Sequence, residues 1–233
     1  MAALTFELYA RHHCRRGDAE PFVFGSKPLG GDLALGEGRS VYAPTLEGFV
    51  SKKREHFVAG RACLREALKD AGCRFDHWAP YKADYPPEMP PGFVGSITHG
   101  GDWALAICVP RSLDEVFLGV DWEPHPPIER ARKLWSRVID DEEASRLPSL
   151  EVSRAFSFVF SAKEALYKAF SPKALGALGF DAAKLIEAAA EGDEYRVTYR
   201  LDAKNWGPRD GSTVVLRARS LDEGAAALVV GEW

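Results

Sequence analysis

Phe117-Leu118-Gly119-Val120-Asp121-Trp122-Glu123-Pro124 is the stretch around which the chain is organised. If this stretch is an extended strand, its side chains alternate, so Asp121 and Glu123 point to one side while Val120 and Trp122 point to the other. Two carboxylates directed at one point repel each other unless a proton or a cation lies between them. The alternative is a strand that ends in solvent, where two exposed acids are ordinary.

The ligand type indicates which cation would suit this place. Carboxylate oxygens with room for water suit Mg²⁺, which usually takes one or two protein carboxylates together with substrate phosphates. Taken alone, the pair Asp121 and Glu123 slightly favours the exposed strand end over a magnesium site. The rest of the chain has to decide between them.

Length and composition describe an ordinary globular protein. A chain of 233 residues can bury a real core as one domain or two modest ones. Hydrophobic residues make up 46% and charged residues 27%, which is typical of neither a disordered nor a fibrous chain. The formal net charge of -4 argues against a protein that holds nucleic acid by bulk charge, so we expect no nucleic-acid partner.

Cysteine usage and the N-terminus favour a cytoplasmic protein. The four cysteines are scattered without a C-x-x-C pair, and we expect them to be reduced. Met1 to Ala10 contains Glu7 and lacks a basic start followed by a long apolar core, so it does not resemble a signal peptide. No apolar run approaches the ~20 residues needed to span a bilayer, so we expect no membrane partner.

The first half contains a helical pattern with a basic side. The region from Leu46 to Ala71 has Phe57, Gly60, Leu64 and Leu68 at helical spacing. Arg54, Arg61 and Arg65 fall on one opposite face. That face is either solvated surface or an anion site, since guanidinium groups bind phosphate in a fork.

A hairpin follows a proline-rich connection. Phe93 to His99 and Trp103 to Val109 are predicted strands around the turn Gly100-Gly101-Asp102. His99 therefore lies at a strand end beside two glycines, where a ligand could approach. A histidine at a turn is more often a surface residue.

The second half contains helices and then strands. A helix is predicted near Ile128 to Arg137, and Asp140 with Glu143 has the spacing of a capping box. A longer helix is predicted from about Glu151 to Phe170. The predicted buried stripe of that helix is Phe156, Val159, Phe160, Leu166 and Phe170.

Along the rim of that stripe lie Ser157, Ser161, Glu164 and Lys168. Glu164 and Lys168 are either a routine helical ion pair, worth ~0.2–0.5 kcal/mol, or the lining of a site. The last third ends in predicted strands at Tyr195 to Leu201, Ser212 to Ser220 and Ala225 to Val230. The order of a helix followed by strands therefore occurs in each half.

Three segments together resemble the large, single-chain 4'-phosphopantetheinyl transferases. They are Gly95-Ser96-Ile97-Thr98-His99, Gly119-Val120-Asp121-Trp122-Glu123, and Phe160-Ser161-Ala162-Lys163-Glu164-Ala165-Leu166-Tyr167-Lys168. The last two match the family pattern, G-[IV]-D followed by [WF]-[SC]-x-K-E-[AS]-x-x-K. The Gly60-Arg61 pair and the Ser96-Ile97-Thr98-His99 strand resemble the subgroup associated with siderophore and peptide synthesis.

The resemblance implies both a fold and a reaction. The fold is α+β, with two similar α/β halves related by a pseudo-twofold axis, residues 1–116 and 117–233, and with coenzyme A bound between them. The reaction moves the phosphopantetheine arm from coenzyme A to a serine of an acyl or peptidyl carrier protein and releases adenosine 3',5'-bisphosphate. The pseudo-dimeric architecture also implies a monomer.

The resemblance further implies roles for single residues. Asp121, Glu123 and Glu164 would be ligands of Mg²⁺, and Glu123 ranks below the other two because some family members carry another residue there. Asp121, Glu164 and Lys168 would be catalytic: Lys168 would neutralise or protonate the departing phosphate, and Glu164, or a water that it holds, would be the base. Because a bound cation lowers the pKa of a carboxylate, the water route is favoured.

The remaining implied residues bind coenzyme A or the carrier. The coenzyme A set comprises Arg54 and Arg61 at the 3'-phosphate, Thr98 and His99, and the phosphate-binding Lys163 and Lys168. Carrier proteins are typically acidic, so a basic rim is expected, with Arg154, Lys163 and Lys173 as candidates.

Two other functions remain possible from the residues alone. The first is another Mg²⁺-dependent phosphotransferase or phosphodiesterase that uses the same acids. The second is a module that binds coenzyme A or a carrier protein without catalysis, which the intact acids and Lys168 disfavour.

Overall fold

The computed structural model describes residues 27–28, 60–61, 63–64, 67–68, 71–73, 89–101, 103–110, 116–170, 178–202 and 211–232. The chain divides into two compact units, Met1–Val116 with Glu232–Trp233, and Phe117–Gly231. Each unit has its own sheet, so the α+β class predicted from the sequence is confirmed. The pseudo-twofold relation between the halves stays a prediction.

The first unit contains a sheet in the order β1-β3-β2, formed by β1 (Lys27–Pro28), β2 (Phe93–Gly100) and β3 (Trp103–Pro110). The predicted hairpin is confirmed, with His99 paired to Ala104 in the antiparallel ladder. Helical residues at Gly60 and Leu64 pack against it, and a Cβ added at Gly60 would lie 2.8 Å from Ile97 Cγ2. A glycine at this place therefore lets the helix approach β2 closely.

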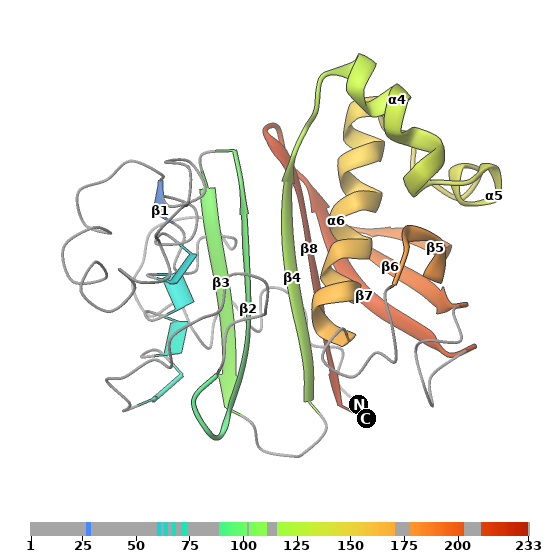
Figure 1. Cartoon of the computed structure of the whole chain (residues 1–233). Coiled ribbons are helices and arrows are strands. Elements are labelled where there is room, and N and C mark those ends of the chain that lie inside the picture. The colour runs from blue at the N-terminus through green and yellow to red at the C-terminus, as the bar shows by residue number, and fades with distance from the viewer. Residues whose placement is uncertain are drawn as a thin grey trace. The chain divides into compact units, whose positions relative to one another are not determined.

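The second unit has a sheet in the order β4-β8-β7-β6-β5 (Figure 1). Its strands are β4 (Val116–Pro124), β5 (Ala183–Glu191), β6 (Glu194–Leu201), β7 (Thr213–Ser220) and β8 (Gly224–Glu232). The pairs β5–β6, β6–β7 and β7–β8 are antiparallel. This sheet provides the surface on which the helices pack.

Helix α6 (Val152–Phe170) lies across one face of that sheet (Figure 1). Its residues Phe156, Val159, Leu166 and Phe170 are at most 3% exposed and pack with Val197 and other strand residues in one core. Burial of such side chains stabilises the unit by roughly 1.5–3 kcal/mol each. Helices α4 (Ile128–Val138) and α5 (Asp141–Ala144) precede α6, and the 3-10 helix η3 (Phe180–Ala182) leads into β5.

Gly119 explains how closely β4 packs on α6. A Cβ at this position would lie 2.0 Å from the carbonyl oxygen of Ala165 and 2.8 Å from the amide nitrogen of Ala169. The two backbones therefore touch directly, which only glycine permits. This contact brings Asp121, two residues further along β4, to the side of α6.

Most elements of the second unit agree with the sequence predictions, including the reciprocal capping box of Asp140 and Glu143. Strand β5 was not predicted. Its sequence, AKLIEAAAE, is rich in good helix formers and lacks alternation, so pairing with β6 determines its conformation. Within the residues that the structure describes, no helix has both the length and the apolar character to cross a membrane.

Candidate active site

A cluster of three acids and one lysine forms where β4 lies against α6. Lys168 Nζ is 2.6 Å from Asp121 Oδ1 and donates to the carbonyl oxygen of Val120 at 3.3 Å. The Asp121 side chain is 7% exposed and that of Lys168 is 26% exposed. A carboxylate buried to this degree requires a paired charge, and Lys168 supplies one.

Glu123 and Glu164 complete the cluster. Burial, followed by the charge of Asp121, raises the pKa of Glu123 to about 7, and Glu164 adds to this rise while Arg130 and Lys168 oppose it. Burial and the charge of Asp121 also raise the pKa of Glu164, while Lys168 opposes this rise. The three carboxylates are therefore within electrostatic reach of one another, and the alternation in β4 had predicted this for Asp121 and Glu123.

The donor set suits a hard divalent cation. Carboxylate oxygens are the ligands that Mg²⁺ takes. Burial is the main reason that the pKa values of Glu123 and Glu164 are raised, and a cation would relieve the repulsion by Asp121 that adds to the rise. Among the described residues, however, no three His, Cys, Asp or Glu side chains are gathered closely enough to hold a metal ion. The ammonium of Lys168 balances Asp121 in this arrangement, and the metal-ligand set stays a prediction.

A pocket adjoins the cluster on the α6 side. Glu164 belongs to both, because its carboxylate interacts with Asp121 and its side chain lines the pocket. The other lining residues are Lys163, Tyr167, Leu178, Gly179, Phe180 and Ala183. Tyr167 is 43% exposed at the surface of α6. A substrate group that reaches Glu164 can therefore lie against an apolar wall.

The predicted coenzyme A residues of the first unit are described in part. Arg61 is 8% exposed and Thr98 is 3% exposed, while His99 is exposed. The burial of Arg61 contradicts the solvated-face alternative at this position. Arg54 lies outside the described residues, as does the basic rim candidate Lys173.

Lys163 has a different place from the predicted one. Its Nζ donates to the carbonyl oxygens of Val138 at 2.7 Å and Phe180 at 2.9 Å, and it forms an ion pair with Glu143 at 2.7 Å. An ammonium has three N–H donors, so these partners use all of them. In this arrangement the ammonium of Lys163 is bonded within the fold, and its binding of phosphate or of an acidic carrier stays a prediction.

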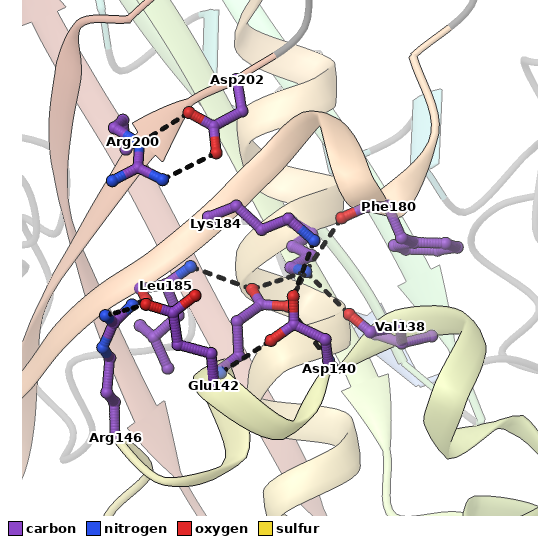
Figure 2. A network of polar contacts seen from close by, with 11 residues as sticks. Val138, Asp140, Glu142, Arg146, Phe180, Lys184, Leu185, Arg200 and Asp202 are labelled. Carbon is purple, nitrogen blue, oxygen red and sulfur yellow. Dashed lines mark hydrogen bonds and ion pairs between the residues drawn. The ribbon is translucent and has the colours of Figure 1, made fainter.

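The partners of Lys163 belong to a network that Figure 2 shows in part, with Val138, Asp140, Phe180, Lys184 and Leu185 labelled. Glu143 accepts hydrogen bonds from the backbone N–H of Leu185 at 2.9 Å and of Asp140 at 3.3 Å. Lys184 pairs with Asp140 at 2.8 Å. The network ties α4, α5, β5 and α6 together next to Glu164.

Sequence reasoning missed two residues near the acids. Arg130, on α4, has a charge that lowers the pKa of Glu123, and no motif includes it. His125 lies two residues after Glu123 and contacts Ser157 of α6. The prolines on either side of His125, which fix the backbone, are the signal that could have drawn attention to it.

Comparison with known proteins yields matches to both halves of the chain. Residues 42–109 match the 4'-phosphopantetheinyl transferase N-terminal domain, and residues 117–213 match the 4'-phosphopantetheinyl transferase superfamily. The three motif segments of the sequence lie within these two ranges.

Individual relatives have names of the same kind. Enterobactin synthase component D of Salmonella typhi is 36% identical over 136 residues, covering 58% of this chain and 54% of the relative. The 4'-phosphopantetheinyl transferase PptT of Mycobacterium tuberculosis is 28% identical over 82% of this chain and 78% of its own length. The 4'-phosphopantetheinyl transferase Svp of Streptomyces mobaraensis is 32% identical over 65% of this chain and 61% of its own length. The matched stretch thus spans about half the length of the enterobactin relative.

Proposed function

We propose that this chain, which belongs to the 4'-phosphopantetheinyl transferase superfamily, transfers the 4'-phosphopantetheine arm of coenzyme A to a serine of an apo carrier protein. The observation that carries the proposal is the ion pair of Lys168 with Asp121 beside Glu123 and Glu164. The products are the holo carrier protein and adenosine 3',5'-bisphosphate. The reaction requires neither a membrane nor nucleic acid, and we expect a cytoplasmic monomer.

The reaction sets a clear chemical demand. When the serine hydroxyl attacks phosphorus, negative charge accumulates on the phosphate and on the leaving group, so catalysis is mostly positioning and electrostatic stabilisation. A Mg²⁺ ion held by Asp121, Glu123 and Glu164 would supply Lewis-acid stabilisation of that charge.

Lys168 supplies the positive charge at the leaving group. Its side chain is 26% exposed and its ammonium pairs with a carboxylate at 2.6 Å, so a phosphate oxygen can take the place of that carboxylate. The ammonium then neutralises or protonates the departing phosphate.

Glu164 is the proposed base for the serine hydroxyl. It is half-buried on α6 and faces both the acids and the adjoining pocket. From this place its carboxylate accepts the proton of the serine hydroxyl, directly or through a water molecule. The pocket wall formed by Tyr167, Leu178 and Phe180 would receive the largely apolar pantetheine arm next to Glu164.

The first unit would bind the nucleotide phosphates of coenzyme A through Arg54, Arg61, Thr98 and His99. For Arg61 we expect a contact with the 3'-phosphate. The variant Arg61→Lys keeps the charge but loses the guanidinium fork. It should therefore weaken binding of coenzyme A more than binding of 3'-dephospho-coenzyme A, measured by calorimetry. Equal losses would disprove the 3'-phosphate contact.

Helix α4 is the proposed docking surface for the carrier protein. Of the earlier candidates, Arg154 pairs with Asp222 at 3.1 Å, and Lys163 is buried. In contrast, α4 exposes Arg130, Arg132, Lys133 and Arg137 against one acid, Glu129. The charge of Arg130 also acts on Glu123, so this basic surface borders the acids. An acidic carrier that binds α4 would present its serine to the cluster.

Charge reversal tests this docking surface. The variant Arg132→Glu/Lys133→Glu should raise the KM for an acidic carrier, because like charges across an interface slow association. The turnover number at saturating carrier should stay unchanged. The control is Arg200→Glu, an exposed reversal on β6. An equal KM for the two variants would exclude α4 as the docking surface.

One assay tests the function itself. The protein is incubated with coenzyme A, Mg²⁺ and several apo carrier proteins, and the mass of each carrier is measured. A gain equal to one phosphopantetheine arm is expected. Bound coenzyme A without any mass gain would indicate the non-catalytic binding module instead. Cleavage of coenzyme A without transfer to a carrier would indicate a phosphodiesterase.

A further inference from the structure

The end of β4 is joined to α6 by a histidine that lies outside the sequence motifs. His125 Nδ1 is 2.6 Å from Ser157 Oγ, and Nε2 is 2.8 Å from the carbonyl oxygen of Leu221, in the turn between β7 and β8. A carbonyl oxygen only accepts hydrogen bonds, so Nε2 carries a proton and donates it to Leu221. Both ring nitrogens are therefore engaged by other elements.

The surroundings make this contact well fixed. Ser157 is fully buried, and its hydroxyl is also 3.1 Å from the carbonyl oxygens of both Ser153 and Arg154 within α6. The backbone N–H of His125 donates to the carbonyl oxygen of Glu223 at 3.1 Å. The end of β4, the first turns of α6 and the β7–β8 turn thus meet at this ring.

Two contacts enclose the acids between them. At one end Gly119 touches Ala165, and at the other end His125 touches Ser157. From Gly119 in β4 to His125, one residue past the end of β4, the partner on α6 moves from Ala165 back to Ser157, so the pair of contacts fixes how strand and helix are aligned. Asp121 and Glu123 lie between the two contacts.

We infer that His125 is a positioning residue of the transfer reaction. Its ring, bonded to Ser157 and Leu221, holds β4 against α6 so that Asp121 and Glu123 meet Glu164 and Lys168. The inference rests on the proposed function, because alignment of these groups matters only if they act together. A misplacement of about 1 Å in a catalytic site can cost roughly 100-fold in rate.

Two variants break the contact from opposite sides. His125→Gln keeps an N–H donor for the carbonyl oxygen of Leu221 but loses the ring nitrogen that contacts the Ser157 hydroxyl. Ser157→Ala leaves the ring in place and removes only the hydroxyl, and alanine favours the helix. The matched control is Ser161→Ala, since Ser161 is equally buried on α6 and its hydroxyl donates to Phe158 within the same helix.

Both variants should lower kcat by roughly 10- to 100-fold, with calorimetric binding of coenzyme A in the absence of metal unchanged. The heat of Mg²⁺ binding to the protein–coenzyme A complex should report weaker binding in both variants and not in Ser161→Ala. The two residues act through one bond. The kcat of the double variant should therefore be no lower than that of the less active single variant. Should His125→Gln fail to fold, Ser157→Ala decides alone.

Wild-type kcat and wild-type Mg²⁺ binding in the two variants would overturn the inference, and so would losses that multiply in the double variant. Either result leaves the proposed function intact as long as the wild-type protein modifies the carrier. If the wild-type protein transfers nothing, the proposed function fails, and unchanged Mg²⁺ binding in Ser157→Ala then overturns the inference separately.

Discussion

Lys163 and Lys168 belong to the same helix, yet their ammonium groups are in opposite situations. The Lys163 side chain is 3% exposed, and its donors are used by Glu143 and by the backbone carbonyls of Val138 and Phe180. The Lys168 side chain is 26% exposed, and its ammonium pairs with Asp121 at 2.6 Å. The ammonium of Lys163 is fully bonded within the fold, while that of Lys168, in the proposed function, would exchange its carboxylate for a substrate phosphate.

The same contrast separates the acids. Glu143 is 1% exposed, and its carboxylate is bonded to Lys163 and to the backbone N–H of Leu185. Glu164 follows Lys163 directly in sequence but faces the acids of β4 and the pocket. Lys163 and Glu164 are neighbours in one motif, yet Lys163 forms a structural pair with Glu143, while Glu164 lies with Lys168 in the proposed catalytic cluster. The difference lies in how many partners each side chain has within the fold, as the three partners of Lys163 show, and not in its position in the motif.

The largest expected effect comes from breaking the buried pair. Lys163→Met leaves the Glu143 carboxylate buried without its cation, which should lower the free energy of unfolding by about 3–5 kcal/mol. Burial lowers the pKa of Lys163, and Glu143 opposes that change by favouring the ammonium. Urea denaturation of the purified variant measures the loss.

A second substitution makes this prediction sharper. Lys163→Met/Glu143→Gln removes both charges and should recover part of the lost stability, because the unpaired carboxylate is gone. Wild-type stability of Lys163→Met, together with loss of transfer, would return Lys163 to the phosphate-binding role that the sequence suggested.

The next effect concerns Lys168, the lysine of the proposed catalytic cluster. Lys168→Ala should lower kcat by roughly 100-fold while changing the affinity for coenzyme A little, because the ammonium acts on charge that develops in the reaction. Lys184→Ala is the matched control, since the Lys184 side chain is also 26% exposed and also pairs with an aspartate, Asp140, at 2.8 Å. A loss of affinity with unchanged kcat would move Lys168 into a binding role.

The smallest effect is a pH dependence of stability. The hydrogen bond from Lys184 lowers the pKa of Asp140, with a further contribution from the N–H of Glu143. A lowered folded-state pKa gives stability that is present above the unfolded pKa, near 3.9, and is lost as pH falls through the folded value. Asp140→Asn keeps the N-cap acceptor and removes only the charge.

The free energy of unfolding of Asp140→Asn should therefore be lower than that of the wild type by less than about 1 kcal/mol at pH 7, as for other exposed ion pairs. The difference should vanish at acidic pH, where the wild-type carboxyl is protonated. Denaturation midpoints from pH 2 to pH 7 test this. A difference that stays constant over this range would contradict the ion-pair explanation.

The sequence allowed much of the fold and of the cluster to be predicted, for physical reasons. Helix α6 has a strong apolar stripe, and the Asp140–Glu143 spacing correctly indicated the capping box of the short helix α5. Strand β5 escaped prediction because its conformation comes from pairing with β6 rather than from its own residues.

The site divides in the same way. Asp121, Glu123, Glu164 and Lys168 lie in short local motifs, and strand alternation placed the acids of β4 together. The partners of Lys163 in the structure were not predicted, because sequence does not reveal which donors the fold has already used. His125 was missed because its partners, Ser157 and Leu221, are distant in sequence and no local pattern connects them.

The central claim is that the acids and Lys168 form the catalytic centre of a phosphopantetheinyl transfer. The most direct test is the mass of an apo carrier protein after incubation with coenzyme A, Mg²⁺ and either the wild-type protein or Glu164→Gln. The wild type should add one phosphopantetheine arm, while Glu164→Gln, with an unchanged melting temperature, should add essentially none. Modification by Glu164→Gln at the wild-type rate would contradict the claim.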